Sequence, residues 1–153
     1  MFLSAREYLQ FLRAPRVYME EPPTFKETQW QPTLKFDYPV VTLGNIDIHM
    51  NHYRSFDEAV NIWQRRKARI NWYNLFVAAY TESEDVLREF DAMPYGKKVC
   101  FVPFKSDLDS AWHINPTAGA KFWGTVNKFA QGEPFTYDPF DMLLYGKKTP
   151  TNI

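Results

Sequence analysis

A cluster of basic and amide side chains surrounds the end of a predicted helix. Arg66 and Arg69 lie in its last turns, and Asn71 and Asn74 follow in the turn toward an apolar strand. A guanidinium group binds a phosphate or carboxylate through two parallel hydrogen bonds, and an asparagine amide can orient a hydroxyl group. These residues therefore form a candidate site for an anionic substrate. Cations in the last turn also complement the helix dipole, so helix capping is the structural alternative.

Two histidines and an aspartate form a second candidate site. Asp47 and His49 share one side of a predicted strand, and His52 follows three residues later. Because histidine changes its charge near neutral pH, His49 and His52 are candidate acids, bases or polar binding groups. The same three residues are acceptable ligands for zinc or another divalent ion, as in a metal-dependent hydrolase. We prefer the acid–base role and expect no bound metal, because this spacing is common and the single cysteine adds no ligand.

Trp112 and His113 form a third candidate site, in a segment that follows a predicted strand. A tryptophan ring can stack on a sugar, and a histidine can transfer a proton. Asp107 and Asp109 belong to the same predicted loop, 106–116. This loop lies at the carboxyl edge of a sheet, where open α/β proteins usually bind ligands, whereas the basic cluster lies at the less usual amino edge. A solvated loop is the structural alternative.

The composition is that of an ordinary soluble domain, with 45% hydrophobic and 24% charged residues. Lys and Arg number 18 and so do Asp and Glu, so charge alone predicts no binding to nucleic acid or to an anionic membrane. No apolar run is long enough for a transmembrane helix, and the first residues do not resemble a signal peptide. The single cysteine, Cys100, cannot form an internal disulfide, which favours a reducing compartment such as the cytoplasm. We interpret it as a small core residue.

Motifs for common cofactors and nucleophiles are absent from the sequence. It contains no Gly-rich phosphate loop, no Gly-x-Ser-x-Gly elbow and no Cys-x-x-Cys pair. P-loop nucleotide hydrolysis and thiol redox chemistry are therefore disfavoured, and no cofactor is expected.

Two capping boxes predict the first helices. Ser4 and Ser55 each precede a glutamate by three residues, which predicts a helix up to Ala14 and a second helix over 56–70. In the second helix Trp63 lies on the apolar face. We expect Trp63 to be buried against a sheet formed by later strands.

A hairpin is predicted between these two helices. The apolar runs 40–43 and 46–50 flank Gly44-Asn45, a two-residue sequence that favours a tight hairpin turn. The preceding residues, 20–39, contain four prolines among polar residues and read as an extended connection over the surface.

The second half of the chain alternates strands and helices. Strands are predicted over 74–79 and 98–104, with a helix after Thr81 between them, and a right-handed crossover would make these strands parallel neighbours. A further amphipathic helix is predicted over 118–130. The predicted fold is one layered α/β domain over residues 1–153, with a short, partly parallel sheet, the Gly-Asn hairpin and flanking helices.

Several sequence strings occur in a fixed order within about the first 105 residues. They are Tyr38-Pro39-Val40, Leu43-Gly44-Asn45-Ile46-Asp47-Ile48-His49, His52-Tyr53, Ala59 to Trp63, Arg66, Arg69-Ile70-Asn71, Asn74-Leu75-Phe76-Val77, Phe90-Asp91, Met93-Pro94-Tyr95 and Lys97-Lys98-Val99. In this combination the chain resembles a family of bacterial proteins labelled exopolysaccharide biosynthesis proteins, which are built around a domain of unknown function.

The resemblance implies an α/β fold and a cytoplasmic role in surface-polysaccharide biosynthesis. It suggests a protein that assists or performs group transfer onto a glycan or its activated precursor. A phosphorylated or nucleotide-sugar ligand is the implied binding partner. A non-catalytic interaction domain is the alternative function, and a metal-dependent hydrolase is a third.

The resemblance also implies that the family architecture is longer. Members usually begin with a further α/β portion that carries an Asn-Asn-Cys-aromatic-Gly stretch, and Met1 aligns after it. We therefore expect this chain to be the C-terminal part of that architecture. An apolar surface around Phe2, Leu9 and Leu12 would then be left for self-association or for the missing portion.

Overall fold

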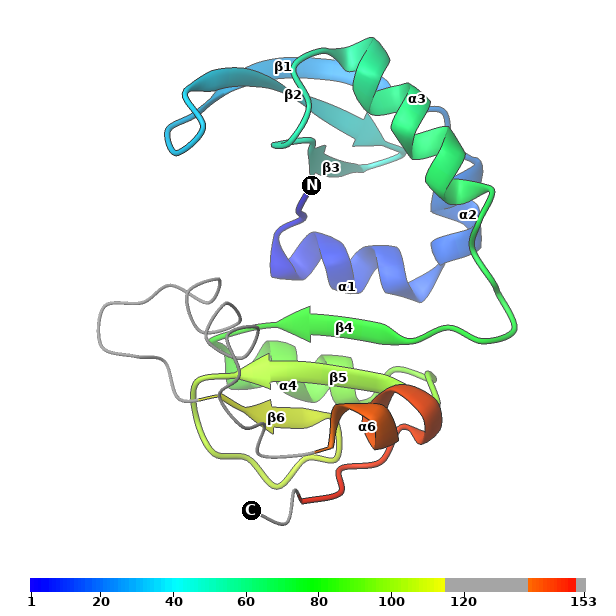
Figure 1. Cartoon of the computed structure of the whole chain (residues 1–153), viewed down its shortest axis with the longest axis vertical. Helices are drawn as coiled ribbons and strands as arrows, with labels where there is room; N and C mark the ends of the chain where they lie inside the picture. The colour runs from blue at the N-terminus through cyan, green and yellow to red at the C-terminus, as the bar shows by residue number, and fades with distance from the viewer. Residues whose placement is uncertain (115–137, 151–153) are drawn as a thin grey trace. The chain divides into compact units, whose positions relative to one another are not determined.

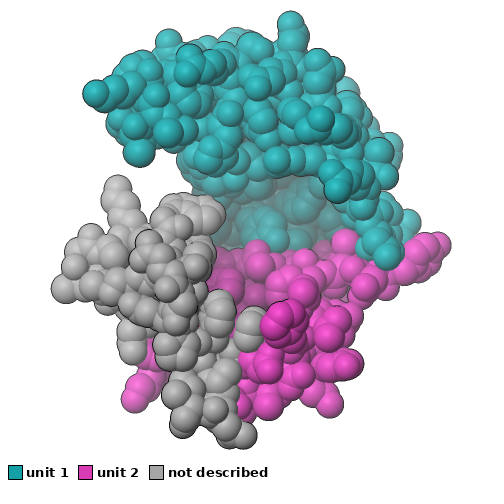
Figure 2. Space-filling model, viewed as in Figure 1, with its two compact units in different colours: residues 1–72 teal, residues 73–153 magenta. Residues whose placement is uncertain are grey.

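The structure is a computed structural model that describes residues 1–114 and 138–150. The chain divides into two compact units, residues 1–72 and residues 73–153 (Figure 2). Both units combine helices with a three-stranded sheet, which confirms the predicted α/β class (Figure 1).

The N-terminal unit contains one antiparallel sheet of order β1-β2-β3. Its elements are α1 (Ala5–Arg13), α2 (Pro15–Glu20), β1 (Thr24–Gln31), β2 (Phe36–Leu43), β3 (Ile46–His49) and α3 (Phe56–Lys67). The predicted Gly-Asn hairpin is confirmed as β2-β3, and Gly44 adopts φ +62°, the left-handed conformation that glycine tolerates best. The capping box of Ser4 is also confirmed.

The prediction of an extended connection over 20–39 is wrong. β1 pairs along its length with β2, so β2 is the central strand of the sheet. β1 is largely exposed, and its polar sequence lacks the apolar alternation by which a half-buried strand is recognised. Pro39 lies within the central strand, a position that normally argues against a strand. The helix predicted up to Ala14 is followed at once by α2, which begins at Pro15, because proline is well tolerated in the first position of a helix.

Trp63 is buried, as predicted, with 6% of its surface exposed. α3 packs against β2 and α1 against β3, and Trp63 belongs to a core cluster with Val41 and Ile48. The expectation that Trp63 packs on a sheet of strands 74–79 and 98–104 is therefore wrong. The hairpin supplies its apolar partners instead. α3 also ends at Lys67, three residues earlier than predicted.

The C-terminal unit contains one parallel sheet of order β4-β5-β6. Its described elements are β4 (Val77–Tyr80), α4 (Glu84–Asp91), β5 (Lys98–Val102), β6 (Ala111–His113) and α6 (Pro139–Tyr145). The predicted parallel pairing of the first two strands is confirmed. Two details are wrong: Ser83, not Thr81, caps α4, and β6 occupies part of the predicted loop 106–116. The helix predicted over 118–130 lies outside the described residues.

Helices cover both faces of the parallel sheet. Figure 1 shows α4 behind the sheet and α6 in front of it, and Met142 of α6 packs with Val99 and Trp112. Cys100 is fully buried in β5, as predicted. Burial, with a smaller effect of Asp91, raises the pKa of its thiol to about 12, so it is an unreactive core residue.

The predicted apolar surface around the first helix is not exposed as a whole. Phe2 is 45% exposed, but Leu9 and Leu12 are buried. The apolar side chains of α6 are exposed instead, namely Phe140, Leu143, Leu144 and Tyr145. No helix within the described ranges combines the length and hydrophobicity needed to cross a bilayer.

Candidate functional site

His49 lies at the end of β3, and its ring is held by neighbouring side chains. The Tyr38 hydroxyl donates to Oε1 of Gln29 at 2.9 Å and lies 3.2 Å from Nδ1 of His49. Because the phenolic hydrogen is used on Gln29, the phenolic oxygen is available to accept from Nδ1–H of His49. This arrangement favours the tautomer with a lone pair on Nε2, which can accept a proton.

A stacked phenylalanine holds the other side of His49. The ring of Phe2 is nearly parallel to the imidazole, with centroids 4.4 Å apart and an interplanar angle of 7°. The backbones of Phe2 and His49 also exchange two hydrogen bonds, at 3.0 and 2.9 Å. The ring orientation of this half-buried histidine is therefore fixed.

His52 follows β3 in an exposed turn and lies within electrostatic reach of Arg66 on α3. Partial burial, the amino group of Met1 and Arg66 lower the pKa of His52 below its usual value of 6.5. The imidazole is therefore neutral near pH 7. Two predicted site residues, one after the hairpin and one in the last turn of α3, therefore lie within electrostatic reach of each other.

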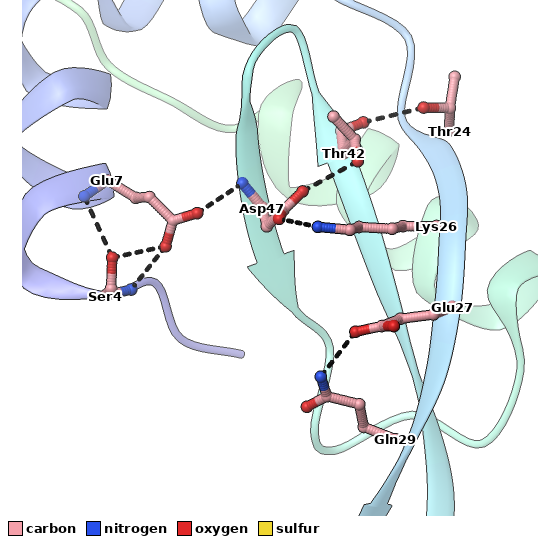
Figure 3. Close-up of polar contacts among 8 residues, drawn as sticks. All are labelled: Ser4, Glu7, Thr24, Lys26, Glu27, Gln29, Thr42 and Asp47. Carbon is pink, nitrogen blue, oxygen red and sulfur yellow. Dashed lines mark hydrogen bonds and ion pairs between the residues drawn. The ribbon is translucent and has the colours of Figure 1, made fainter.

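Arg66 is exposed, and although its backbone oxygen accepts from Arg69 at 3.0 Å, its guanidinium group makes no hydrogen bond or ion pair with any residue in the described ranges. The carboxylate of Asp47 does not pair with Arg66, because it accepts from the ammonium group of Lys26 and, at 2.9 Å, from the Thr42 hydroxyl (Figure 3). These interactions, led by that with Lys26, lower the pKa of Asp47. The cation on α3 is therefore available to an external anion.

Asp47 belongs to a structural network. Its backbone N–H donates to Oε1 of Glu7 at 3.0 Å, while the other carboxylate oxygen of Glu7 accepts from the backbone and hydroxyl of Ser4 (Figure 3). The network ties the start of α1 to β3. Among the described residues no group of three His, Cys, Asp or Glu side chains is arranged to hold a metal, so Asp47, His49 and His52 do not form one.

The remaining residues of the basic cluster are dispersed. Arg69 and Asn71 are exposed beyond the end of α3, in the N-terminal unit. Asn74 belongs to the C-terminal unit, where its Oδ1 accepts from Nζ of Lys97 at 2.9 Å. Within one unit the cluster therefore retains Arg66, Arg69 and Asn71 only.

The third predicted group is also divided. Trp112 is 3% exposed and packs in the core, so its ring offers no surface on which a sugar could stack. His113 is half-buried at the end of β6. Asp107 and Asp109 line two different cavities. The loop that was expected to gather these side chains instead runs into a strand.

The cavity at Asp107 was not predicted and lies at the carboxyl edge of the parallel sheet. It has a volume of about 350 Å³ and is lined by Arg88, Lys105 and Ser106, among others. Arg88 is 3.8 Å from Glu84, so the cavity contains charges of both signs. The sequence signal that could have located this cavity is the prediction of parallel strands, because open parallel sheets usually bind ligands at the carboxyl ends of their strands.

The described residues thus form a mixed α/β protein in which His52 and Arg66, both of the N-terminal unit, lie within electrostatic reach of each other. The DUF1919 family, described as a domain of unknown function, matches residues 1–145. The chain belongs to this family. It is also 30% identical over 152 residues to an uncharacterized protein of Haemophilus influenzae, an alignment that covers 95% of this chain and 70% of that protein.

Proposed function

We propose that this chain binds a phosphorylated glycan precursor through Arg66 and promotes transfer of its glycosyl group, with His52 as the proton acceptor. The proposal is carried by an exposed guanidinium group that has no carboxylate partner among the described residues and lies within electrostatic reach of His52, whose pKa is lowered by partial burial, the amino group of Met1 and Arg66. A base and an anion-binding group side by side are what such a transfer requires.

The chemistry assigns one role to each residue. As an acceptor hydroxyl oxygen forms its bond to the sugar carbon, His52 takes the hydroxyl proton. The bond from that carbon to the phosphate oxygen breaks, and Arg66 balances the charge of the departing phosphate. His52 then returns its proton to water. His49, held with Nε2 as acceptor, is a second polar group on the same hairpin.

The proposed biological setting is surface-polysaccharide biosynthesis in the cytoplasm. The sequence resemblance to exopolysaccharide biosynthesis proteins supports the pathway. The single buried thiol of Cys100 is compatible with a reducing compartment. The neutral charge balance of the chain favours a small anion over nucleic acid as the ligand.

A thermal-shift experiment tests anion binding. Pyrophosphate and a nucleotide-sugar are expected to raise the melting temperature of the wild-type chain, and added salt should weaken the effect. Arg66→Ala should abolish the increase without destabilising the free protein, because Arg66 is exposed. Arg65→Ala is the matched control, since Arg65 is the exposed neighbour on the same helix. Equal increases in all three proteins would contradict the proposed site.

An interaction domain is the second candidate function, and the exposed side chains of α6 favour it. Phe140 is 70% exposed and Tyr145 is 63% exposed, although Met142 of the same helix is buried. Exposed apolar surface of this kind often marks an interface. Self-association is then expected at micromolar concentration in sedimentation experiments, and Phe140→Ser should reduce it. A monomer with no change in the variant would argue against this function.

A further inference from the structure

A second cavity in the C-terminal unit lies where the end of α4 meets the start of β6. Its volume is about 250 Å³, and its lining includes Asp91, Tyr95, Asp109 and Ser110. Pockets for drug-sized ligands are typically larger, from about 300 Å³ upward, so this cavity suits a smaller molecule. It lies at the amino edge of the parallel strands, and the proposed function makes no use of it.

Asp91 anchors the wall of this cavity but has hydrogen-bonding capacity left. Its Oδ1 accepts from the backbone N–H of Ser110 at 2.9 Å, whereas Oδ2 has no hydrogen-bond donor among the described residues. Burial acts to raise the pKa of Asp91, but the backbone hydrogen bond from Ser110, the nearby Ser110 hydroxyl and the charges of Lys98 and Lys148 outweigh it and lower the pKa. The carboxylate is therefore ionised and able to accept.

Ser110 is the most unusual group in the lining. It is 2% exposed, and its hydroxyl makes no hydrogen bond of good geometry with any described residue, although it lies near enough to Asp91 to favour the ionised carboxylate. A buried hydroxyl without a partner costs free energy and usually has an external one. Because the hydroxyl oxygen is itself buried, the Ser110 side chain has to turn toward the cavity before a ligand hydroxyl can supply that partner.

The charges around the cavity decide between classes of ligand. Asp91 and Asp109 are negative, while Lys98 and Lys148 are positive and lie near Asp91. The ammonium group of Lys98 is used on the backbone oxygens of Asp91 and Met93, and that of Lys148 on those of Leu108 and Ala111. Both ammonium groups are thus engaged on backbone oxygens, which disfavours a phosphate, and their positive charges offset the carboxylate of Asp91 that would attract a divalent cation.

We propose that this cavity binds a neutral sugar ring. Carboxylate and serine oxygens accept hydrogen bonds from vicinal hydroxyl groups, and the half-buried ring of Tyr95 offers an apolar surface for the C–H face of the sugar. The site uses residues of the C-terminal unit only, so it is independent of the proposed anion site.

Amide chemical shifts of the full chain in a ¹H–¹⁵N spectrum test this site. Neutral methyl glycosides of glucose, galactose and mannose are titrated, and the amides of Gly96, Ser110 and Gly146 are followed, because these residues line the cavity. At least one glycoside should shift these amides, with a dissociation constant on the order of millimolar, as expected for so small a ligand. Ser110→Ala and Asp109→Ala should weaken binding about tenfold, as loss of a hydrogen bond to a desolvated or charged group does.

Asp107→Ala is the control, because Asp107 is an exposed carboxylate that lines the other cavity. It should leave the titration unchanged, and so should Arg66→Ala, since the glycosides carry no charge. The proposal is overturned if no glycoside shifts these amides, if the shifts survive both cavity substitutions, or if calcium or inorganic phosphate shifts the amides in place of the glycosides.

Discussion

The phenolic oxygen of Tyr38 lies 3.2 Å from Nδ1 of His49, between neighbouring strands of the hairpin. Tyr38 is 6% exposed and donates to Gln29, so its oxygen can only accept from the imidazole. This contact determines which nitrogen of His49 carries the hydrogen. The proton-accepting ability assigned to Nε2 depends on it.

Tyr38→Phe is expected to release this constraint. His49 should then become a mixture of tautomers, visible in the imidazole ¹⁵N chemical shifts, and stability should fall by about 1 kcal/mol for the lost hydrogen bond. Tyr18→Phe is the control, because it removes a different phenol of the same unit, one that donates to Asn45 at 2.7 Å. Unchanged nitrogen shifts in Tyr38→Phe would contradict the assigned tautomer.

Trp63→Ala should destabilise the chain by about 3–5 kcal/mol, the usual cost of deleting a large buried aromatic side chain. Urea unfolding followed by circular dichroism measures this loss. Trp30→Ala is matched to it, because Trp30 is 57% exposed in the same unit and should change stability far less. Similar losses in the two variants would show that the core of the N-terminal unit is wrongly described.

Gly146→Ala should destabilise the C-terminal unit by roughly 2–4 kcal/mol, from left-handed backbone strain together with overpacking. Gly146 adopts φ +67°, and an added Cβ would lie 2.6 Å from the backbone oxygen of Gly96. Gly96→Ala provides the comparison, because a Cβ there meets no atom within 4 Å. Thermal unfolding should separate the two variants, and equal melting temperatures would refute the close approach.

The lowered pKa of His52 predicts a pH dependence of stability. Below its usual pKa of 6.5 the unfolded chain takes up a proton before the folded chain does, so this contribution is present above pH 6.5 and is lost as the pH falls through the lower, folded pKa. Urea midpoints between about pH 7.5 and pH 5 should therefore decrease less steeply in His52→Gln than in the wild type. Identical slopes would contradict the shift.

Local signals predicted much of the fold. The capping-box patterns at Ser4 and Ser55 and the Gly44 turn depend on residues close in sequence, so the starts of both helices and the hairpin turn were predicted correctly. β1 was not predicted, because its sequence is polar and largely exposed and lacks the alternation typical of a strand. Its pairing with β2 is a tertiary property.

The site was predictable only in part, for a related physical reason. The residue types of His52 and Arg66 indicate a chemical role, but their electrostatic coupling depends on the packing of α3 against β2, which is a tertiary property. Trp112 was misjudged, because a polar segment around it concealed a short buried strand. The cavity beside Ser110 is lined by segments that are distant in sequence, since Asp91 and Ser110 are 19 residues apart. A local sequence pattern cannot predict such a cavity.

The central claim, that His52 and Arg66 together form an anion site, is tested most directly by the pKa of His52. An NMR titration of its Cε1 proton should give a pKa below 6.5 in the free wild-type chain. Bound pyrophosphate should raise this pKa, because a nearby anion favours the protonated imidazole. The same increase is expected in Arg65→Ala but not in Arg66→Ala. A pKa that pyrophosphate leaves unchanged in the wild type, or raises equally in Arg66→Ala, would contradict the account.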